Sequence, residues 1–142
     1  LCKPKLDNLL TGKYVDLYDK VIIIDCRFSY EYDGGHIQGA VNLNTKSELE
    51  NYFFGSSLTS DRTVVVFHCE YSAQRGPRMA LYLRSRDREV NLANYPNLTF
   101  PELYVLDGGY RNFYNMHKTF CEPQDYVAMN DDQFNAECKK RM

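Results

Sequence analysis

Two unbroken apolar runs dominate the hydrophobic pattern of the chain. They are VIII at residues 21–24 and VVVF at 64–67, within the predicted strands at 20–25 (KVIIID) and 62–68 (RTVVVFH), and both are rich in β-branched side chains. A continuous run of this length is typical of a strand buried on both faces, because a half-exposed strand alternates apolar and polar positions. Residues 40–43 (AVNL) predict a further short strand, and residues 102–109 (ELYVLDGG) predict a strand and a turn.

The segments between these strands have helical patterns. Residues 76–90 are predicted to be helical, with Pro77 in the first turn, where its missing N–H removes no intrahelical hydrogen bond. A second helix begins with a cap candidate, Thr45 or Ser47, and ends at Gly55. Shorter helices or helical turns are predicted at residues 5–12, at 28–35, from 111 onward and, with acids first and bases last, at 131–142.

Alternation of apolar strands with helices predicts an α/β sandwich around a mostly parallel central sheet. The length of 142 residues fits one domain, and the 44% hydrophobic and 25% charged residues are typical of a soluble globular protein. No apolar run approaches the roughly 18 residues of a membrane span. Because Leu1 is not an initiator methionine, we expect residues 1–142 to be a fragment of a longer protein.

Charge and cysteine content narrow the functional classes. A formal net charge of −2 and a pI near 5.9 argue against general nucleic-acid binding. The five cysteines are widely spaced and form no C-x-x-C motif, and the three histidines are not at metal-ligand spacing. We therefore expect a reducing compartment, no disulfide framework and no metal.

Cys69 stands at a position suited to chemistry. It directly follows the strand predicted at residues 62–68, and a loop from Glu70 to Gln74 joins it to Arg75. In parallel sheets, active sites lie beyond the carboxyl ends of the strands. A short loop between a strand and a helix can turn its backbone N–H groups inward to form an anion nest, and the helix adds the positive end of its dipole. Both effects favour a thiolate at Cys69.

The cysteine, the loop amides and the arginine are the groups that displacement at a phosphate monoester requires. A thiolate can attack phosphorus, the planar guanidinium of Arg75 can donate to two phosphate oxygens, and water can release the cysteinyl-phosphate. The alternative is that Cys69 is a small buried hydrophobe. The apolar strand before it, the Gly76-Pro77 pair after it and the adjacent His68, which we interpret as structural, favour the catalytic interpretation.

The loop resembles that of a known family. HCEYSAQRGPRM, residues 68–79, resembles the signature loop of the M-phase inducer phosphatases, which are dual-specificity phosphatases with a rhodanese-like fold. The segments VIIIDCRFSYEYDGGHIQGAVNL, NYPNLTFPELYVLDGGYRNFYNMH and CEPQDYVAMN carry the same resemblance, which covers most of residues 14–130. It implies a rhodanese-like three-layer sandwich for the catalytic domain at residues 1–142.

The resemblance also implies a substrate and a site. The substrates are phosphothreonine and phosphotyrosine on cyclin-dependent kinase–cyclin complexes, whose activation promotes entry into mitosis. The resemblance makes Cys69 the nucleophile and Arg75 the phosphate clamp, and it implies no cofactor, no nucleic-acid or membrane partner, a monomer, and a nuclear and cytoplasmic location. Glu70 would hold the loop and influence protonation, or simply accept bonds from backbone amides. The implied phosphate-binding residues are Glu70, Tyr71, Ser72, Ala73, Gln74 and Arg75.

Two positions depart from related sequences. Gln74 stands where many animal members of the family have a glutamate, and an amide cannot act as an acid. Gly76 stands where tyrosine phosphatases at large have Ser or Thr, as it does in the family itself. The sequence shows no aspartate-bearing acid loop, so the general acid is not identified and the proton of the substrate itself can serve. We interpret four polar residues as a scaffold beneath the site: Asp25, Arg27, Glu31 and His36.

A redox pair is predicted beside the loop. Cys26 and Cys69 each follow a buried strand that we place side by side. Neighbouring strands lie about 4.8 Å apart, and a disulfide accepts Cα separations up to about 6.8 Å. The resemblance implies the same pair, with Cys26 as the resolving thiol. The alternative is that Cys26 is only a core residue.

A docking patch is predicted farther along the helix. Arg84 and Arg88 lie four residues apart, where like charges cost an isolated helix about 0.2–0.5 kcal/mol. The resemblance implies that they dock the kinase substrate, with Tyr95 as an aromatic neighbour. The alternative is a solvated surface on which Asp87 and Glu89 offset the repulsion.

Three other functions stay open. A rhodanese sulfurtransferase shares the fold and the loop cysteine, but its loop is typically one residue shorter. An arsenate reductase also uses H-C-x5-R, although the downstream segments argue against it. The third is a non-catalytic module that docks a kinase, against which the presence of both Cys69 and Arg75 argues.

Overall fold

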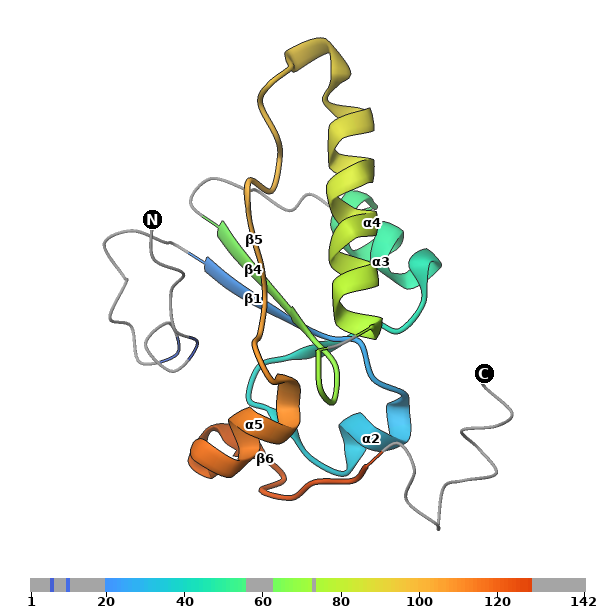
Figure 1. Ribbon diagram of the computed structural model, residues 1–142. Helices are drawn as coiled ribbons and strands as arrows, with labels where there is room; N and C mark the ends of the chain where they lie inside the picture. Colours follow the sequence, from blue (N-terminus) through green and yellow to red (C-terminus); the bar gives the residue numbers. More distant parts are fainter. Residues whose placement is uncertain (1–5, 7–9, 11–19, 56–62, 73, 129–142) are drawn as a thin grey trace.

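A computed structural model describes residues 6, 10, 20–55, 63–72 and 74–128 (Figure 1). The helix predicted at residues 5–12, apart from Leu6 and Leu10, and the one predicted at residues 131–142 lie outside the described residues. In the described part of the chain, no helix is long and apolar enough to cross a membrane.

A parallel sheet forms the centre of the described structure, as the sequence predicts. Its strands are β1 (Lys20–Asp25), β3 (Val41–Asn42), β4 (Thr63–His68) and β5 (Glu102–Val105), in the spatial order β3-β1-β4-β5. All of the pairings between them are parallel. The register of β1 and β4 places Asp25 beside His68, so their carboxyl ends meet at one edge of the sheet.

Both faces of the sheet are covered, which is why its central strands are apolar throughout. Ile22 and Ile24 pack with helices α3 (Lys46–Phe54) and α4 (Arg75–Val90). Ile23 faces the other way and packs with α5 (Gly109–Met116). Figure 1 shows α3 and α4 on one side, and α5 with the short α2 (Ser29–Asp33) near the carboxyl ends of the strands. These layers confirm the predicted mostly parallel α/β sandwich.

Local capping explains where α3 begins. Of the two cap candidates, Thr45 is the N-cap, because its hydroxyl accepts a hydrogen bond from the Glu48 N–H at 3.1 Å. Gly55 is the C-cap, as predicted. A hydroxyl cap of this kind satisfies one of the backbone N–H groups that a helix start leaves without a partner.

The long connection from α4 to β5 is held in place by a buried carboxylate. Asp87 accepts hydrogen bonds from the backbone N–H groups of Thr99 and Phe100 at 2.9 and 2.7 Å, and from the Asn91 side chain at 2.7 Å. This connection contains the one-turn helix η1 (Leu92–Asn94) and lies at the end of α4 that is far from α2 and α5 (Figure 1). Asp87 therefore fixes both ends of the segment that carries Tyr95.

Several of the smallest elements in the described residues are absent from the sequence prediction. They include the antiparallel strands β2 (His36–Ile37) and β6 (Cys121–Glu122) and the one-turn helices η1 and η2 (Lys118–Phe120). Elements of two or three residues are too short to show a hydrophobic period. Helix α5 also begins at Gly109, two residues before the predicted start.

Candidate active site

The candidate site is the loop between β4 and α4. Cys69 is buried at its start, and Arg75 is the first residue of α4. Ser72 lies in the left-handed region with a φ of 57°, which helps reverse the chain within a short loop. Gln74 is exposed at the N-cap of α4 without a side-chain cap bond, and the predicted Ala73 lies outside the described residues.

The start of α5 determines which way the loop peptides face. The Tyr110 N–H donates to the Cys69 carbonyl at 2.9 Å, and the Arg111 N–H donates to the Glu70 carbonyl at 3.0 Å. In a planar trans peptide the C=O and the following N–H point in opposite directions. The N–H groups of Glu70 and Tyr71 therefore point away from α5. These orientations agree with the predicted anion nest.

Glycines permit the close approach of both helices to the loop. A Cβ on Gly109, which has a φ of 64°, would lie 2.5 Å from the Glu70 carbonyl oxygen. A Cβ on Gly76 would lie 3.2 Å from backbone atoms of His68. Packing of α4 against the end of β4 is therefore a structural reason for glycine directly after Arg75.

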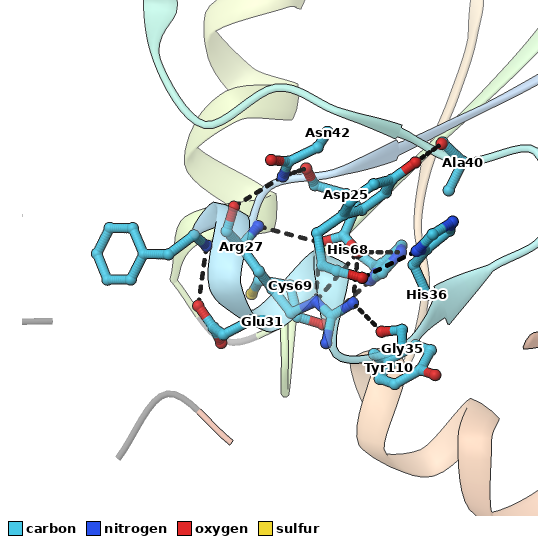
Figure 2. Close-up of polar contacts among 12 residues, drawn as sticks. Asp25, Arg27, Glu31, Gly35, His36, Ala40, Asn42, His68, Cys69 and Tyr110 are labelled. Carbon is cyan, nitrogen blue, oxygen red and sulfur yellow. Dashed lines mark hydrogen bonds and ion pairs between the residues drawn. The ribbon is translucent and has the colours of Figure 1, made fainter. Parts of the chain in front are cut away.

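Arg75 is held by a carboxylate that we interpreted from the sequence as scaffold. Its guanidinium donates to both oxygens of Glu31, at 2.7 and 3.1 Å, and lies 5.4 Å from the centre of the Phe28 ring. Glu31 is fully buried and also accepts from the Phe28 N–H at 2.8 Å (Figure 2). Burial alone would lower the pKa of Arg75, but the bonds and charge of Glu31 outweigh it and raise that pKa. Glu31 therefore orients the arginine from beneath.

A buried ionic layer lies under the loop (Figure 2). The guanidinium of Arg27 donates to both oxygens of Asp25, the shortest contact being 2.6 Å, and to the Gly35 carbonyl at 2.8 Å. Burial by itself would raise the pKa of Asp25, but the neighbouring Arg27 cation and its hydrogen bonds oppose burial, and the pKa is lowered. Asp25 therefore stays ionised although it is fully buried. The layer agrees with the scaffold role expected for Asp25 and Arg27.

His68 contributes to this layer as a neutral ring. Its Nε2 lies 3.8 Å from Asp25, and its Nδ1 lies 3.1 Å from the Cys69 carbonyl oxygen. Complete burial lowers the pKa of His68 more than the Asp25 charge raises it. His36, also expected to be scaffold, lies against the Tyr32 ring, with ring centroids 3.8 Å apart. The ring nitrogens of His68 face Asp25 and a backbone carbonyl, and His36 Nδ1 faces the Tyr32 carbonyl, so neither histidine is placed to act as a catalytic base.

Glu70 has a partner that the sequence does not reveal. Its buried carboxylate accepts a hydrogen bond from the Tyr126 hydroxyl. Tyr126 follows β6 and stacks on Tyr110, with ring centroids 5.8 Å apart. Burial and the Glu70 carboxylate raise the pKa of Tyr126, so the hydroxyl keeps its proton. Periodicity cannot find Tyr126, although it lies within the segment CEPQDYVAMN that carries the resemblance.

Cys26 lies beside the loop cysteine, at the end of the neighbouring strand. Its N–H donates to the His68 carbonyl at 2.8 Å, directly before Cys69, and both thiols are buried and free. Burial, followed by the negative charges of Asp25 and Cys69, raises the pKa of Cys26 well above the usual range. Cys26 is thus a neutral thiol next to the candidate nucleophile.

The predicted docking residues lie apart from this cluster. Arg84 donates to the Phe100 and Pro101 carbonyls, both at 3.0 Å, so some of its N–H donors are already occupied within the structure. Arg88 is exposed, and Tyr95 is 85% exposed. The structure thus brings Cys69, Glu70, Arg75 and Cys26 together, and it places Arg88 about 20 Å along α4 from Arg75, at about 1.5 Å per residue.

Comparison with known proteins agrees with this architecture. The rhodanese-like domain family matches residues 6–116. A solved yeast protein tyrosine phosphatase of the rhodanese family superposes with a TM-score of 0.60 at 23% identity, covering 81% of this chain and 85% of that one. An As-Sb reductase from Leishmania major gives a TM-score of 0.60 at 23% identity, covering 94% and 93%. At such identity these structures show the fold.

Sequence relatives are closer. The M-phase inducer phosphatase of Schizosaccharomyces pombe is 53% identical over 142 residues, which are all of this chain and 24% of the relative. Human M-phase inducer phosphatase 2 is 48% identical over 92% of this chain and 23% of its own length. The chain thus spans about a quarter of the relatives it matches. These findings confirm the resemblance drawn from the loop and the rhodanese-like fold, and the chain belongs to the family of rhodanese-like domains.

Proposed function

We propose that the chain is the catalytic domain of a cysteine-dependent protein phosphatase that acts on phosphotyrosine and phosphothreonine of cyclin-dependent kinases. The observation that carries the proposal is the loop geometry: peptides turned by α5 and an arginine fixed by Glu31 frame the buried Cys69. The names of the sequence relatives support the substrate class. From the resemblance of the loop alone, we also propose that the protein works in the nucleus and cytoplasm.

The proposed reaction has two displacements. The Cys69 thiolate attacks phosphorus, and the alcohol of the substrate leaves with a proton while a cysteinyl-phosphate forms. Water then attacks phosphorus, which releases phosphate and restores the thiolate. The loop amides and Arg75 stabilise the charge on the transferring group in both steps. Gln74 cannot supply a proton, and Glu70 is engaged with Tyr126. A phosphate monoanion brings its own proton for the leaving oxygen.

The alternatives share the fold and differ at the loop. The loop between Cys69 and Arg75 holds five residues, longer than is typical of sulfurtransferases. The As-Sb reductase has the same fold, but 23% identity carries no activity across. A non-catalytic docking module would not need a buried carboxylate dedicated to orienting Arg75.

Cys69→Ser should abolish hydrolysis of an aryl phosphate and keep the binding of inorganic phosphate, because a hydroxyl is a poor nucleophile while the cradle persists. Arg75→Lys should lose both, since an ammonium cannot donate to two oxygens at once. Kinetics and calorimetric titration measure the two effects. Hydrolysis by the serine variant near the wild-type rate would exclude Cys69 as nucleophile. Thiosulfate–cyanide and arsenate–thiol assays on the wild-type protein test the alternatives.

Glu31→Gln should lower kcat/KM for an aryl phosphate by roughly 10- to 100-fold, because a neutral amide presents only one oxygen to the Arg75 guanidinium and loosens its geometry. Glu48→Gln is the matched control. Like Glu31, Glu48 accepts a hydrogen bond from a backbone N–H shortly before it in the chain, that of Asn44 at 3.3 Å. Unlike Glu31, it makes no contact with an arginine among the described residues. Equal activity of the two variants would show that Arg75 does not depend on Glu31.

A redox switch is the third expectation, and it follows from the neighbouring thiols. After peroxide oxidises Cys69 to a sulfenic acid, Cys26 should form a disulfide with it and release water. Because the pKa of Cys26 is raised, its thiolate fraction grows with pH, so the disulfide should form about tenfold faster for each unit between pH 7 and 9. Peptide mapping measures the link.

The control for this switch is Cys121→Ser, which removes a buried thiol that packs with α5 on the opposite face of the sheet from α3 and α4. It should leave the disulfide intact, whereas Cys26→Ser should make inactivation irreversible. Reversible inactivation that persists unchanged in Cys26→Ser would contradict the switch.

Arg88→Ala combined with Tyr95→Ala should reduce hydrolysis of a phosphorylated kinase–cyclin complex and leave an aryl phosphate nearly unaffected. Both side chains are exposed, so their loss removes docking contacts and charge steering without disturbing the core. Arg84→Ala is a separate measurement, because it also breaks two bonds to backbone carbonyls and should lower thermal stability. Equal losses on both substrates would rule out remote docking.

A further inference from the structure

Two arginines border the loop, and only one of them pairs with a carboxylate in the described residues. Arg75 on the α4 side has its charge compensated by the buried Glu31. Arg111 on the α5 side is exposed, and within the described residues it makes no ion pair with a carboxylate. The α5 side of the loop therefore presents positive charge that its described surroundings do not neutralise.

Arg111 contacts the loop through its backbone and through its guanidinium. Its backbone N–H donates to the Glu70 carbonyl at 3.0 Å, which places its Cα beside the loop. The guanidinium carbon lies 5.7 Å from the centre of the ring of Tyr71, the next loop residue. Tyr71 is 53% exposed, although an apolar ring of this size usually gains from burial. The ring thus supports a cation directly at the border of the loop.

We propose that Arg111, supported by Tyr71, determines specificity by binding an anionic side chain next to the phosphorylated residue of a peptide substrate. The proposal rests on the proposed function, since it assumes that a phosphorylated side chain enters the loop. Consecutive Cα atoms of a peptide lie about 3.8 Å apart, so the residue next to the phosphorylated one passes the border of the loop, where the long Arg111 side chain can meet its anionic group. A guanidinium forms paired hydrogen bonds with either a carboxylate or a phosphate.

Peptides that differ only beside the phosphotyrosine test the proposal. The neighbour is phosphothreonine, glutamate, alanine or lysine, and kcat/KM is measured for each. The wild-type protein should prefer the anionic neighbours over alanine by roughly three- to tenfold, and added salt should reduce the preference because the contact is exposed. A preference for phosphothreonine alone would identify a second phosphate as the ligand, and equal preference would identify any anion.

Arg111→Ala should remove this preference and leave hydrolysis of an aryl phosphate unchanged, since the backbone N–H that holds Glu70 remains. Arg111→Glu should reverse the preference toward the lysine peptide. Lys118→Ala is the matched control, because Lys118 lies 5.4 Å from the centre of the Tyr114 ring but follows α5 and does not contact the loop through its backbone. It should keep the wild-type preference.

Three results would overturn the inference: no preference in the wild-type protein, a preference that survives in Arg111→Ala, or the same loss in Lys118→Ala. Failure of the proposed function is a different result, namely no hydrolysis of any phosphate ester. In that case, binding of the same peptides, measured by calorimetry on the wild-type protein and on Arg111→Ala, decides the inference independently.

Discussion

The contact on which the rest of the site depends is the buried pair of Arg27 and Asp25. Arg27 joins the end of β1, through Asp25, to the turn before β2, through the Gly35 carbonyl. Its guanidinium also lies 4.2 Å from the centre of the Tyr110 ring at the start of α5. Loss of one member of a buried ion pair typically costs about 3–5 kcal/mol, because the remaining charge has no solvent. The pair therefore fixes the elements that surround the loop relative to one another.

Orientation of the loop follows from that arrangement. Because Tyr110 is fixed by Arg27, the first turn of α5 presents its N–H groups to the loop carbonyls. A helix start leaves such donors without intrahelical partners, so the carbonyls of Cys69 and Glu70 satisfy a requirement of α5 itself. The N–H groups of Glu70 and Tyr71 are consequently turned the other way before any ligand is present. Preorganised donors of this kind lose little energy to reorientation when charge develops.

The sequence was informative where one residue type has one dominant physical meaning. The apolar strands, the end of a helix at Gly55 and the cysteine at a strand end each follow from local rules, and the structure contains them. Such rules do not show which residues that are distant in the sequence contact one another in the fold. Glu31 and Arg75 are 44 positions apart, and Glu70 and Tyr126 are 56 apart. No period or spacing links such pairs, since only the folded topology brings them into contact. Arg84 is a similar case, because a helix pattern cannot show that backbone carbonyls from another segment occupy its guanidinium.

The fold by itself does not choose among chemistries. A tyrosine phosphatase and an As-Sb reductase both match this chain with a TM-score of 0.60, so the sheet and its helices are compatible with either. The charges around the loop of this chain are more informative than the fold about what the loop can bind. In this chain the fully buried Glu31 keeps Arg75 ionised and oriented, and the Tyr126 hydroxyl holds the Glu70 carboxylate. Each contact places a negative charge where a protein donor already compensates it. The loop interior is left to an incoming anion, which is the condition that the proposed binding of a phosphate group beside Cys69 requires.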